Sequence, residues 1–490
     1  MARSIRIASI AFVCLLALTG AARGGATITI VNKDPASTGF NDPTPATPVG
    51  GNNGTTIGQQ RLNAFQHAAN IWGGLLDSSV EIRIEASFAA LDCTATTAVL
   101  GAASPTQAVS DFPGAQFPGT WYPSALANRI AGSDLFPSVS DITARFNLNL
   151  GHTGCFDGSG WYYGFDNNHG DLIDMVSVLL HEFAHGLGFL TFVDDSGNEF
   201  MSQPDVFERN IFDATANKHW TDMTAAERGT STVNTGNVLW DGPTVTAMAP
   251  QFLDGTPSLS ITAPASIAGF VRVGTASFGP ELSETAVTGP IVAAVDPVEA
   301  TGTSTDGCSP LTNASAVAGK LALVDRGNCN FTVKADNVQA AGAIGLIVAN
   351  NAAGDPPGMG GDDATIHIPA VSVTQADGAA IRAALGSQVI GSLLVNGRML
   401  AGTGAGRRMK LYAPNPVESG SSISHWDTSA FPDLLMEPNL TGALPHTVDL
   451  TLPALYDIGW RPDVTPTPAA RDAVQPTGGN DQTHVVAPRP

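Results

Sequence analysis

The chain has 490 residues, 43% of them apolar, which allows two to four domains with sizeable cores and excludes wholesale disorder. Lys and Arg number 23 against 44 Asp and Glu, and the net charge of −21 argues against nucleic acid or an anionic membrane as a partner. The acidity is typical of a well-solvated exterior.

The first 26 residues have the pattern of a secretory signal peptide. Arg3 and Arg6 give a basic start, the apolar run from Ile7 to Leu18 is too short to span a bilayer, and small residues follow. We expect cleavage near residues 21–26. No later stretch is long and apolar enough for a transmembrane helix. The mature protein is therefore expected to be secreted to the extracellular space.

Export changes how the cysteines are interpreted. Cys14 falls in the leader, which leaves Cys93, Cys155, Cys308 and Cys329. An even number in an oxidising compartment predicts two disulfides, and the simplest of the three connectivities joins Cys93 to Cys155 and Cys308 to Cys329. None of the four has the close spacing of a zinc-thiolate site.

The N-terminal half predicts mixed α and β structure. Alternating or apolar runs predict strands at 26–32, 80–88 and 141–150, and apolar residues at helical spacing predict helices at 56–76 and 171–189.

The amino-acid composition changes twice in the C-terminal half. Residues 265–400 are rich in Val, Ala and Gly and alternate short strands with helices, which predicts a compact α/β module with its own core. Residues 401–462 return to a mixed pattern. Residues 463–490 are rich in Pro, Thr and Ala with few large apolar residues, which predicts a disordered tail.

The stretch "HEFAHGLGFL" carries the most specific chemical signal. Residues four apart share a helix face, so His181 and His185 can bind one zinc ion. Glu182 then lies beside the ion, where it can act as the general base toward zinc-activated water. The apolar helix around the motif disfavours the alternative of two packed histidines beside a surface glutamate.

A catalytic zinc site with this motif needs a third protein ligand, and the residues alone leave several candidates. Asp205 and Glu208 follow in "QPDVFERN", His425 lies in "SHWDTSAF", and His219 in "NKHW" is a weaker version of the same idea. Two further histidines have no neighbouring signal, namely His367 and His446.

"HEFAHGLGF", followed far downstream by "SHWDTSAFPDLLMEP", resembles the leishmanolysin-type metzincin metalloproteases. The resemblance implies that His181, His185 and His425 bind zinc, that Glu182 is the catalytic base, and that Met436 forms a structural turn beneath the imidazoles. It also implies an α+β fold, with a zincin-like or metzincin-like catalytic domain of mixed sheet and active-site helix.

"GKLALVDRGNCNFTVKADNVQAAGAIGLIVANN" resembles the protease-associated (PA) domain, and Cys308 with Cys329 fits a disulfide sometimes found there. This resemblance implies an α/β insert at 265–400 between catalytic segments at 27–264 and 401–462. The third ligand would then lie far downstream in the sequence because a folded domain separates it from the first two.

The leading hypothesis is a secreted zinc endopeptidase that acts on protein or peptide substrates. A second hypothesis is a zincin that uses Glu208 or Asp205 as its third ligand. A third is an exported, non-enzymatic binding or surface protein whose PA domain carries the function. The loop "FVDDSGNE" at 192–199 could bind calcium, although a solvated acidic loop is the favoured interpretation.

Overall fold

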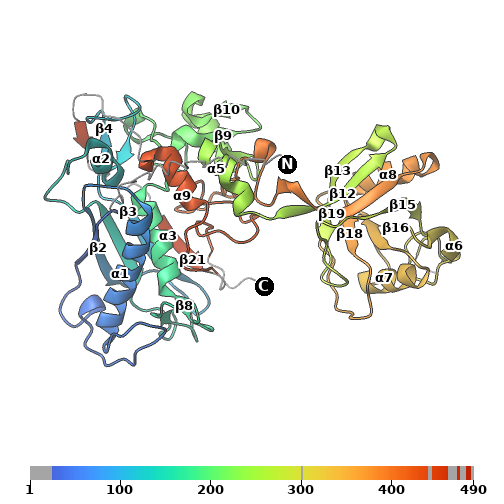
Figure 1. Ribbon diagram of the computed structural model, residues 1–490, viewed down its shortest axis with the longest axis horizontal. Coiled ribbons are helices and arrows are strands. Elements are labelled where there is room, and N and C mark those ends of the chain that lie inside the picture. The colour runs from blue at the N-terminus through green and yellow to red at the C-terminus, as the bar shows by residue number, and fades with distance from the viewer. Residues whose placement is uncertain (1–24, 299–301, 440–443, 462–471, 475–481, 487–490) are drawn as a thin grey trace, which may run out of the picture.

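The computed structural model describes residues 25–298, 302–439, 444–461, 472–474 and 482–486. The expected signal peptide therefore lies almost wholly outside the described residues. Figure 1 shows two bodies joined through β12 and β19, a larger one that carries α1 and α3 and a smaller one that carries α7 and α8.

The larger body is built on a mixed sheet with the strand order β1-β2-β6-β3-β21. Strands β1 (Ile28–Asn32), β2 (Ile82–Ala89) and β6 (Ile142–Asn147) are parallel, and β3 (Ala98–Pro105) pairs antiparallel with β6. The helix α1 (Ile57–Leu75) forms the crossover from β1 to β2. Parallel neighbours require such crossovers because a tight hairpin cannot join them.

The expected α+β class of a zincin-like or metzincin-like catalytic domain is therefore wrong, and this body is α/β with a mixed central sheet. Side chains of β2 alternate between buried and half-buried, as its sequence predicted. Alternation reports which face of a strand is buried. It does not report the direction of the neighbouring strand, which is why the class was missed.

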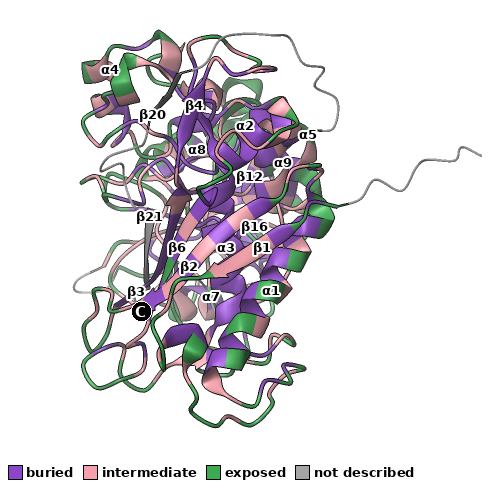
Figure 2. Cartoon of the chain, turned by 90° about the vertical axis from the view of Figure 1, so that its left-hand side faces the viewer, coloured by how far each residue is buried: buried purple, intermediate pink, exposed green. Residues whose placement is uncertain are grey.

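The helix α3 (Met175–Leu187) lies against this sheet, and all of its residues are buried. It begins later than the sequence predicted because Ile173–Asp174 pairs as strand β8 with β7 (Trp161–Tyr162). The Asp174 side chain then caps the helix by accepting the Ser177 N–H at 2.8 Å. The indole of Trp72 on α1 donates to the Leu180 carbonyl at 3.1 Å, which joins the two helices. Figure 2 shows α1 with one buried and one exposed face.

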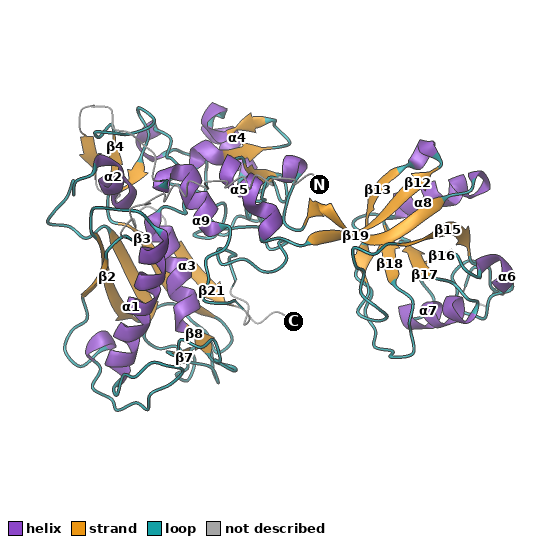
Figure 3. Cartoon of the chain, in the orientation of Figure 1, coloured by secondary structure: helices purple, strands orange, loops and turns teal. Residues whose placement is uncertain are grey.

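The remaining elements of the larger body are short (Figure 3). They are β4 (Ala108–Ser110), β5 (Tyr122–Pro123), α2 (Ser124–Ala131), β9 (Ile211–Asp213), β10 (Lys218–His219), α4 (Ala225–Ser231), β11 (Val238–Trp240), α5 (Pro243–Met248), α9 (Thr451–Leu455) and β20 (Asp472–Val474).

The smaller body has an eight-stranded sheet in the order β13-β12-β19-β15-β16-β17-β18-β14. Its elements are β12 (Gly255–Ala263), β13 (Gly269–Arg272), β14 (Gly274–Thr275), β15 (Val287–Ala293), α6 (Ala314–Val317), β16 (Leu321–Asp325), α7 (Phe331–Ala340), β17 (Gly345–Ala349), β18 (Ala370–Val373), α8 (Gln375–Ala384) and β19 (Ile390–Leu400). Leu321 and Leu323 of β16 join one apolar cluster, whereas Ala322 and Val324 join another. The strand is thus buried on both faces, as in α/β sheets covered by helices.

The two ends of the smaller body lie side by side. Gly255, where β12 begins, is the register partner of Leu400, where β19 ends. A domain with adjacent ends can interrupt a host chain without displacing the host's own elements. The structure also pairs Cys93 with Cys155 in the larger body and Cys308 with Cys329 in the smaller one.

Two short strands are described in the C-terminal segment. Of the tail expected to be disordered at 463–490, β20 pairs with β4 and β21 (Gln482–Val486) pairs with β3. The other residues of that tail lie outside the described ones. None of the helices in the described part of the chain has the length and apolar character needed to cross a membrane.

We expect Gly186→Ala to lower the free energy of unfolding by about 1–3 kcal/mol, the usual penalty of overpacking. A Cβ at Gly186 would stand 2.4 Å from Cγ2 of Ile142 on β6, which fixes how closely α3 approaches the sheet. Urea unfolding followed by tryptophan fluorescence measures the change.

Gly74→Ala is the matched control, since Gly74 is also helical but a Cβ there meets no atom within 4 Å. We expect it to stabilise the protein by about 0.5–1 kcal/mol through helix propensity. Equal stability of the two variants would contradict the close packing of α3 on β6.

Candidate metal centre

The three histidines predicted as ligands lie together in the structure. The Nε2 atom of His181 is 3.1 Å from Nε2 of His185 and 3.2 Å from Nε2 of His425. All three side chains are at most 1% exposed. Within the described residues, they form the one group of three or more His, Cys, Asp or Glu side chains able to share a metal ion.

Backbone carbonyls fix the orientation of each ring. Nδ1 of His181 lies 2.7 Å from the Leu435 carbonyl oxygen, Nδ1 of His185 lies 2.8 Å from that of Phe189, and Nδ1 of His425 lies 2.8 Å from that of Ser421. A carbonyl can only accept, so each Nδ1 carries the hydrogen and each neutral ring presents its Nε2 lone pair to the other two. Metal-binding histidines commonly donate their other ring N–H to a carbonyl or carboxylate in this way.

The electrostatics keep these rings unprotonated. Burial lowers the pKa of His181 to about 4. Burial, followed by repulsion from His181, lowers the pKa of His425 to about 3. Three mutually facing lone pairs repel one another unless a cation lies between them. Tetrahedral zinc with nitrogens at about 2.0–2.1 Å spaces those nitrogens about 3.3 Å apart, close to the distances observed here.

The environment of Glu182, like the spacing of the three nitrogens, indicates whether the site suits a metal ion. It is fully buried, and neither carboxylate oxygen makes a hydrogen bond of normal geometry within the described chain. Burial raises its pKa well above the ordinary value, and the nearby backbone of Ala103 opposes this only in part. A buried carboxyl group without partners is costly, and a bound cation with its water would relieve that cost. The residues therefore fit a zinc ion.

The turn after α3 is needed to orient His185. Gly188 has φ +119°, a conformation that residues with a Cβ rarely adopt, and it closes the helix so that the Phe189 carbonyl turns back to His185. A Cβ at Gly188 would also stand 2.9 Å from the side chains of Ile458 and Pro123. Both the lack of space and the backbone conformation therefore disfavour any residue other than glycine at this position.

His425 is held in place by its neighbour in sequence. The Trp426 ring is fully buried between Phe189, at 4.8 Å between ring centroids, and Trp240, at 6.0 Å. The backbone N–H of Trp426 donates to the Met436 carbonyl at 2.8 Å. Met436 is itself buried and directly follows Leu435, whose carbonyl orients His181. One short loop therefore positions ligands from two parts of the chain.

The carboxylates considered as alternative ligands serve a structural turn. Asp205 accepts hydrogen bonds from Oγ1 of Thr191 at 2.7 Å and from the Glu208 N–H at 2.7 Å. Glu208 lies 3.5 Å from the guanidinium of Arg228. Neither carboxylate belongs to the histidine group.

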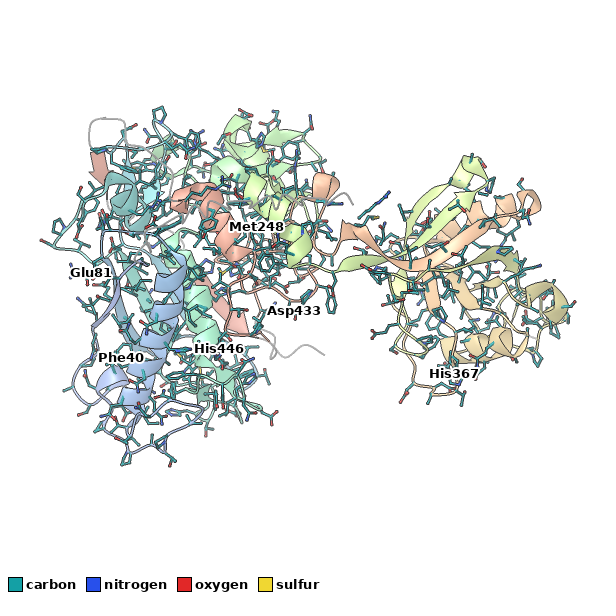
Figure 4. All side chains as sticks on the ribbon, in the orientation of Figure 1. Phe40, Glu81, Met248, His367, Asp433 and His446 are labelled. Carbon is teal, nitrogen blue, oxygen red and sulfur yellow. A yellow bond between two sulfur atoms is a disulfide. The ribbon has the colours of Figure 1, made fainter. Side chains whose placement is uncertain are left out.

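The other histidines also lie elsewhere. Nε2 of His219 is 2.7 Å from Asp241, and Nε2 of His446 is 2.9 Å from Asp174, the residue that caps α3. Figure 4 shows His367 on the smaller body, far from α3, and His446 close to α3. The calcium candidate at 192–199 is a turn that Asp194 closes by accepting N–H groups of Ser196 and Asn198.

Sequence reasoning missed the residues that orient the rings. Leu435, Phe189 and Ser421 act through their carbonyls, so their side chains give no signal. Asp449 also was missed; its carboxylate accepts the Leu435 N–H and the Thr451 N–H. The capping pattern of Asp449 two residues before Thr451 was a signal that could have identified it.

One comparison with known protein families falls within the smaller body. A family model of the PA domain matches residues 287–381, which confirms the PA resemblance. The human ER degradation-enhancing alpha-mannosidase-like protein 3 is 39% identical over 120 residues, which cover 23% of this chain and 12% of that protein. An aminopeptidase of Pseudomonas aeruginosa is 47% identical over 66 residues, 13% of this chain and 12% of the relative. The matched parts are thus far less than two thirds of the relatives' length.

Among solved structures, a zinc aminopeptidase from Bacillus subtilis is 24% identical, with a TM-score of 0.22 over 31% of this chain and 35% of that chain. An aminopeptidase from Aneurinibacillus sp. strain AM-1 is 15% identical, with a TM-score of 0.22 over 39% of this chain and 42% of that one. TM-scores this low do not place two whole chains in one fold.

These findings correct the assignment to the leishmanolysin-type metzincins, which is wrong: the similarity found is to PA-domain proteins and aminopeptidases. The two histidines, the glutamate and a later histidine form a short pattern set by coordination geometry, and such a pattern can arise on unrelated folds. The two curated relatives have names of unlike activities, so a shared accessory domain explains both similarities better than a shared catalytic domain.

We expect His425→Ala to reduce bound zinc by at least about tenfold at equal total zinc, since losing metal-site residues commonly costs 10–100-fold or more in affinity. Metal content after dialysis against a weak chelator, measured by mass spectrometry, reports the loss.

Glu208→Gln is the control, because it changes a buried polar side chain nearby without touching the histidine group. It should retain zinc at the wild-type level. Zinc loss in Glu208→Gln but not in His425→Ala would reverse the assignment of the third ligand.

Proposed function

We propose that this chain is a zinc-dependent peptidase whose site consists of His181, His185, His425 and Glu182. The observation that carries the proposal is the convergence of three buried Nε2 atoms beside a buried carboxyl group. Three nitrogen ligands with a neighbouring base and an open fourth position are the arrangement of hydrolytic zinc sites. We also propose that the protein is secreted, on the basis of its leader sequence.

The bound zinc would polarise a water molecule and the carbonyl of the bond to be cleaved. Glu182 takes a proton from that water and returns it to the departing amine, which requires the same carboxyl group to lose and regain a proton within one cycle. The carbonyls of Leu435, Phe189 and Ser421 keep each imidazole in the tautomer that presents Nε2 to the metal.

Two modes of cleavage are open to such a site. The described residues gather a single group of ligands, which supports a one-ion site and the endopeptidase that the sequence predicted. The alternative, removal of N-terminal residues, is suggested by the aminopeptidase among the similar proteins. A two-ion site would need further ligands, as in other enzymes that use paired metals.

We expect Glu182→Gln to lower kcat by about 10²–10⁴-fold, the usual contribution of a general base, while zinc content stays unchanged. The substitution keeps the shape of the side chain and removes only its ability to take a proton. Activity on casein, together with metal analysis, measures both. A chelator should abolish the wild-type activity, and added zinc should restore it.

Full activity of Glu182→Gln would exclude this mechanism. Absence of hydrolysis in a zinc-loaded wild-type protein would favour instead an exported binding protein whose PA domain carries the function.

The two cleavage modes predict opposite substrate requirements. An endopeptidase should cleave an internally quenched peptide whose two termini are blocked, and it should leave amino-acid p-nitroanilides intact. An aminopeptidase should show the reverse pattern. Mass spectrometry of the products identifies whether cleavage is internal or stepwise from the N-terminus.

A further inference from the structure

His181 differs from the other two histidines in where its orienting carbonyl comes from. For His185 and His425, the carbonyl lies four residues from the histidine itself. The Leu435 carbonyl, by contrast, reaches His181 from a loop 254 residues away in the sequence. The direction of the His181 ring therefore depends on what fixes the backbone of Leu435.

A buried carboxylate fixes Leu435 through its backbone N–H. Oδ2 of Asp449 accepts the Leu435 N–H, while the carbonyl of the same residue accepts the Nδ1–H of His181 at 2.7 Å. Hydrogen bonds to an ionised acceptor are about twice as strong as those between neutral groups. Leu435 is thus held by both of its backbone polar groups, one bound to the proposed ligand and the other to Asp449.

The start of α9 orients Asp449 in turn. Its second oxygen, Oδ1, accepts the Thr451 N–H at 3.0 Å and the Thr451 hydroxyl at 2.8 Å. The chain that continues α9 is itself fixed to the helix α3, because the Trp460 indole donates to the Leu187 carbonyl at 2.9 Å. Asp449 therefore joins the loop that orients His181 to an element that contacts the helix carrying His181.

The partners of Asp449 favour its ionised form. The Leu435 N–H, the Thr451 N–H and the Thr451 hydroxyl all donate, and a carboxylate can accept all three. Burial raises the pKa of Asp449, although these bonds oppose the rise. Leu435 is 1% exposed, so loss of the carboxylate would leave its N–H buried without this partner. The cost of such an unpaired donor would favour a shift of the loop.

We propose that Asp449 is a positioning residue for His181. By holding the Leu435 N–H, Asp449 keeps the Leu435 carbonyl where it directs the His181 ring toward the other two histidines. The consequence for catalysis rests on the proposed peptidase function. The orientation of the ring does not rest on that function and can be tested separately.

His185 provides an internal control within the same helix. Its orienting carbonyl belongs to Phe189, which is placed by the turn at Gly188. That turn uses neither Leu435 nor Asp449. A general loosening of the site would disturb both rings, whereas loss of positioning through Leu435 would disturb His181 more than His185.

The first test is NMR spectroscopy of the zinc-loaded full chain with nitrogen-15 in its histidines. In Asp449→Ala, the Nδ1–H signal of His181 should move upfield and exchange faster with solvent, because its hydrogen bond is weakened. The His185 signal should stay in place. Asp449→Asn has one oxygen for three donors, so it should give a smaller change of the same kind if the alanine variant does not fold. Equal changes at His181 and His185, or none at either, would overturn the positioning role.

The second test is zinc affinity, measured by competition with a chelator of known affinity. Asp449→Ala should bind zinc about tenfold more weakly, since loss of groups that orient metal ligands commonly costs 10–100-fold. Thr451→Val is the matched control, because it removes one hydrogen bond from the same carboxylate and keeps the Thr451 N–H and the bond to Leu435. It should bind zinc like wild type although its free energy of unfolding falls.

An equal loss of zinc affinity in Asp449→Ala and Thr451→Val would assign the effect to stability alone and overturn the proposal. The proposed peptidase function fails by a different result. If the zinc-loaded wild type hydrolyses no peptide, while Asp449→Ala displaces the His181 signal and weakens zinc binding, the positioning role stands and the peptidase function does not.

Discussion

Three hydrogen bonds between imidazole N–H groups and backbone carbonyls determine which ring nitrogens of the histidine group face one another. Each bond fixes one ring in the tautomer that points Nε2 toward the other two. The carbonyls belong to Leu435, Phe189 and Ser421, so the site depends on the backbone of two loops more than on their side chains. The positions of those carbonyls depend in turn on the end of α3 at Gly188 and on the packing of the Trp426 ring against Phe189.

His185 and His425 are separated by 239 residues, and the adjacent ends of the inserted body allow them to meet in space. The inserted body leaves and returns through the paired strands β12 and β19, where Gly255 lies opposite Leu400. The chain therefore leaves the larger body and returns to it at nearly the same place. His425 can then lie beside the helix that carries His185, although the insert separates them in sequence. The Leu411 N–H bonds back to the Val238 carbonyl, which rejoins the chain to the segment that preceded the insert.

The parts of this structure that were predictable are those set by local periodicity or by a dense motif. Spacing placed His181 and His185 on one helix face and identified α1, α3 and the strands β1, β2 and β6, but it did not identify β3 or α2. His425 was chosen among several candidates through a family resemblance that is wrong, and the structure places its ring beside the other two imidazoles. The pairing directions in the sheet could not be predicted, because a strand's side-chain pattern is the same for parallel and antiparallel neighbours. The orienting carbonyls could not be predicted either, since every residue carries one.

Composition and backbone pairing bear on the tail in different ways. Residues 463–490 contain too few large apolar side chains to form a core, and this favoured disorder. Pairing with a sheet edge needs no core, however, because the backbone itself supplies donors and acceptors and β3 supplies a complementary row. In this chain β21 pairs along β3, the strand whose Gly101 lies against Glu182. Whether a segment is structured therefore depends on the surface within its reach as well as on its own residues.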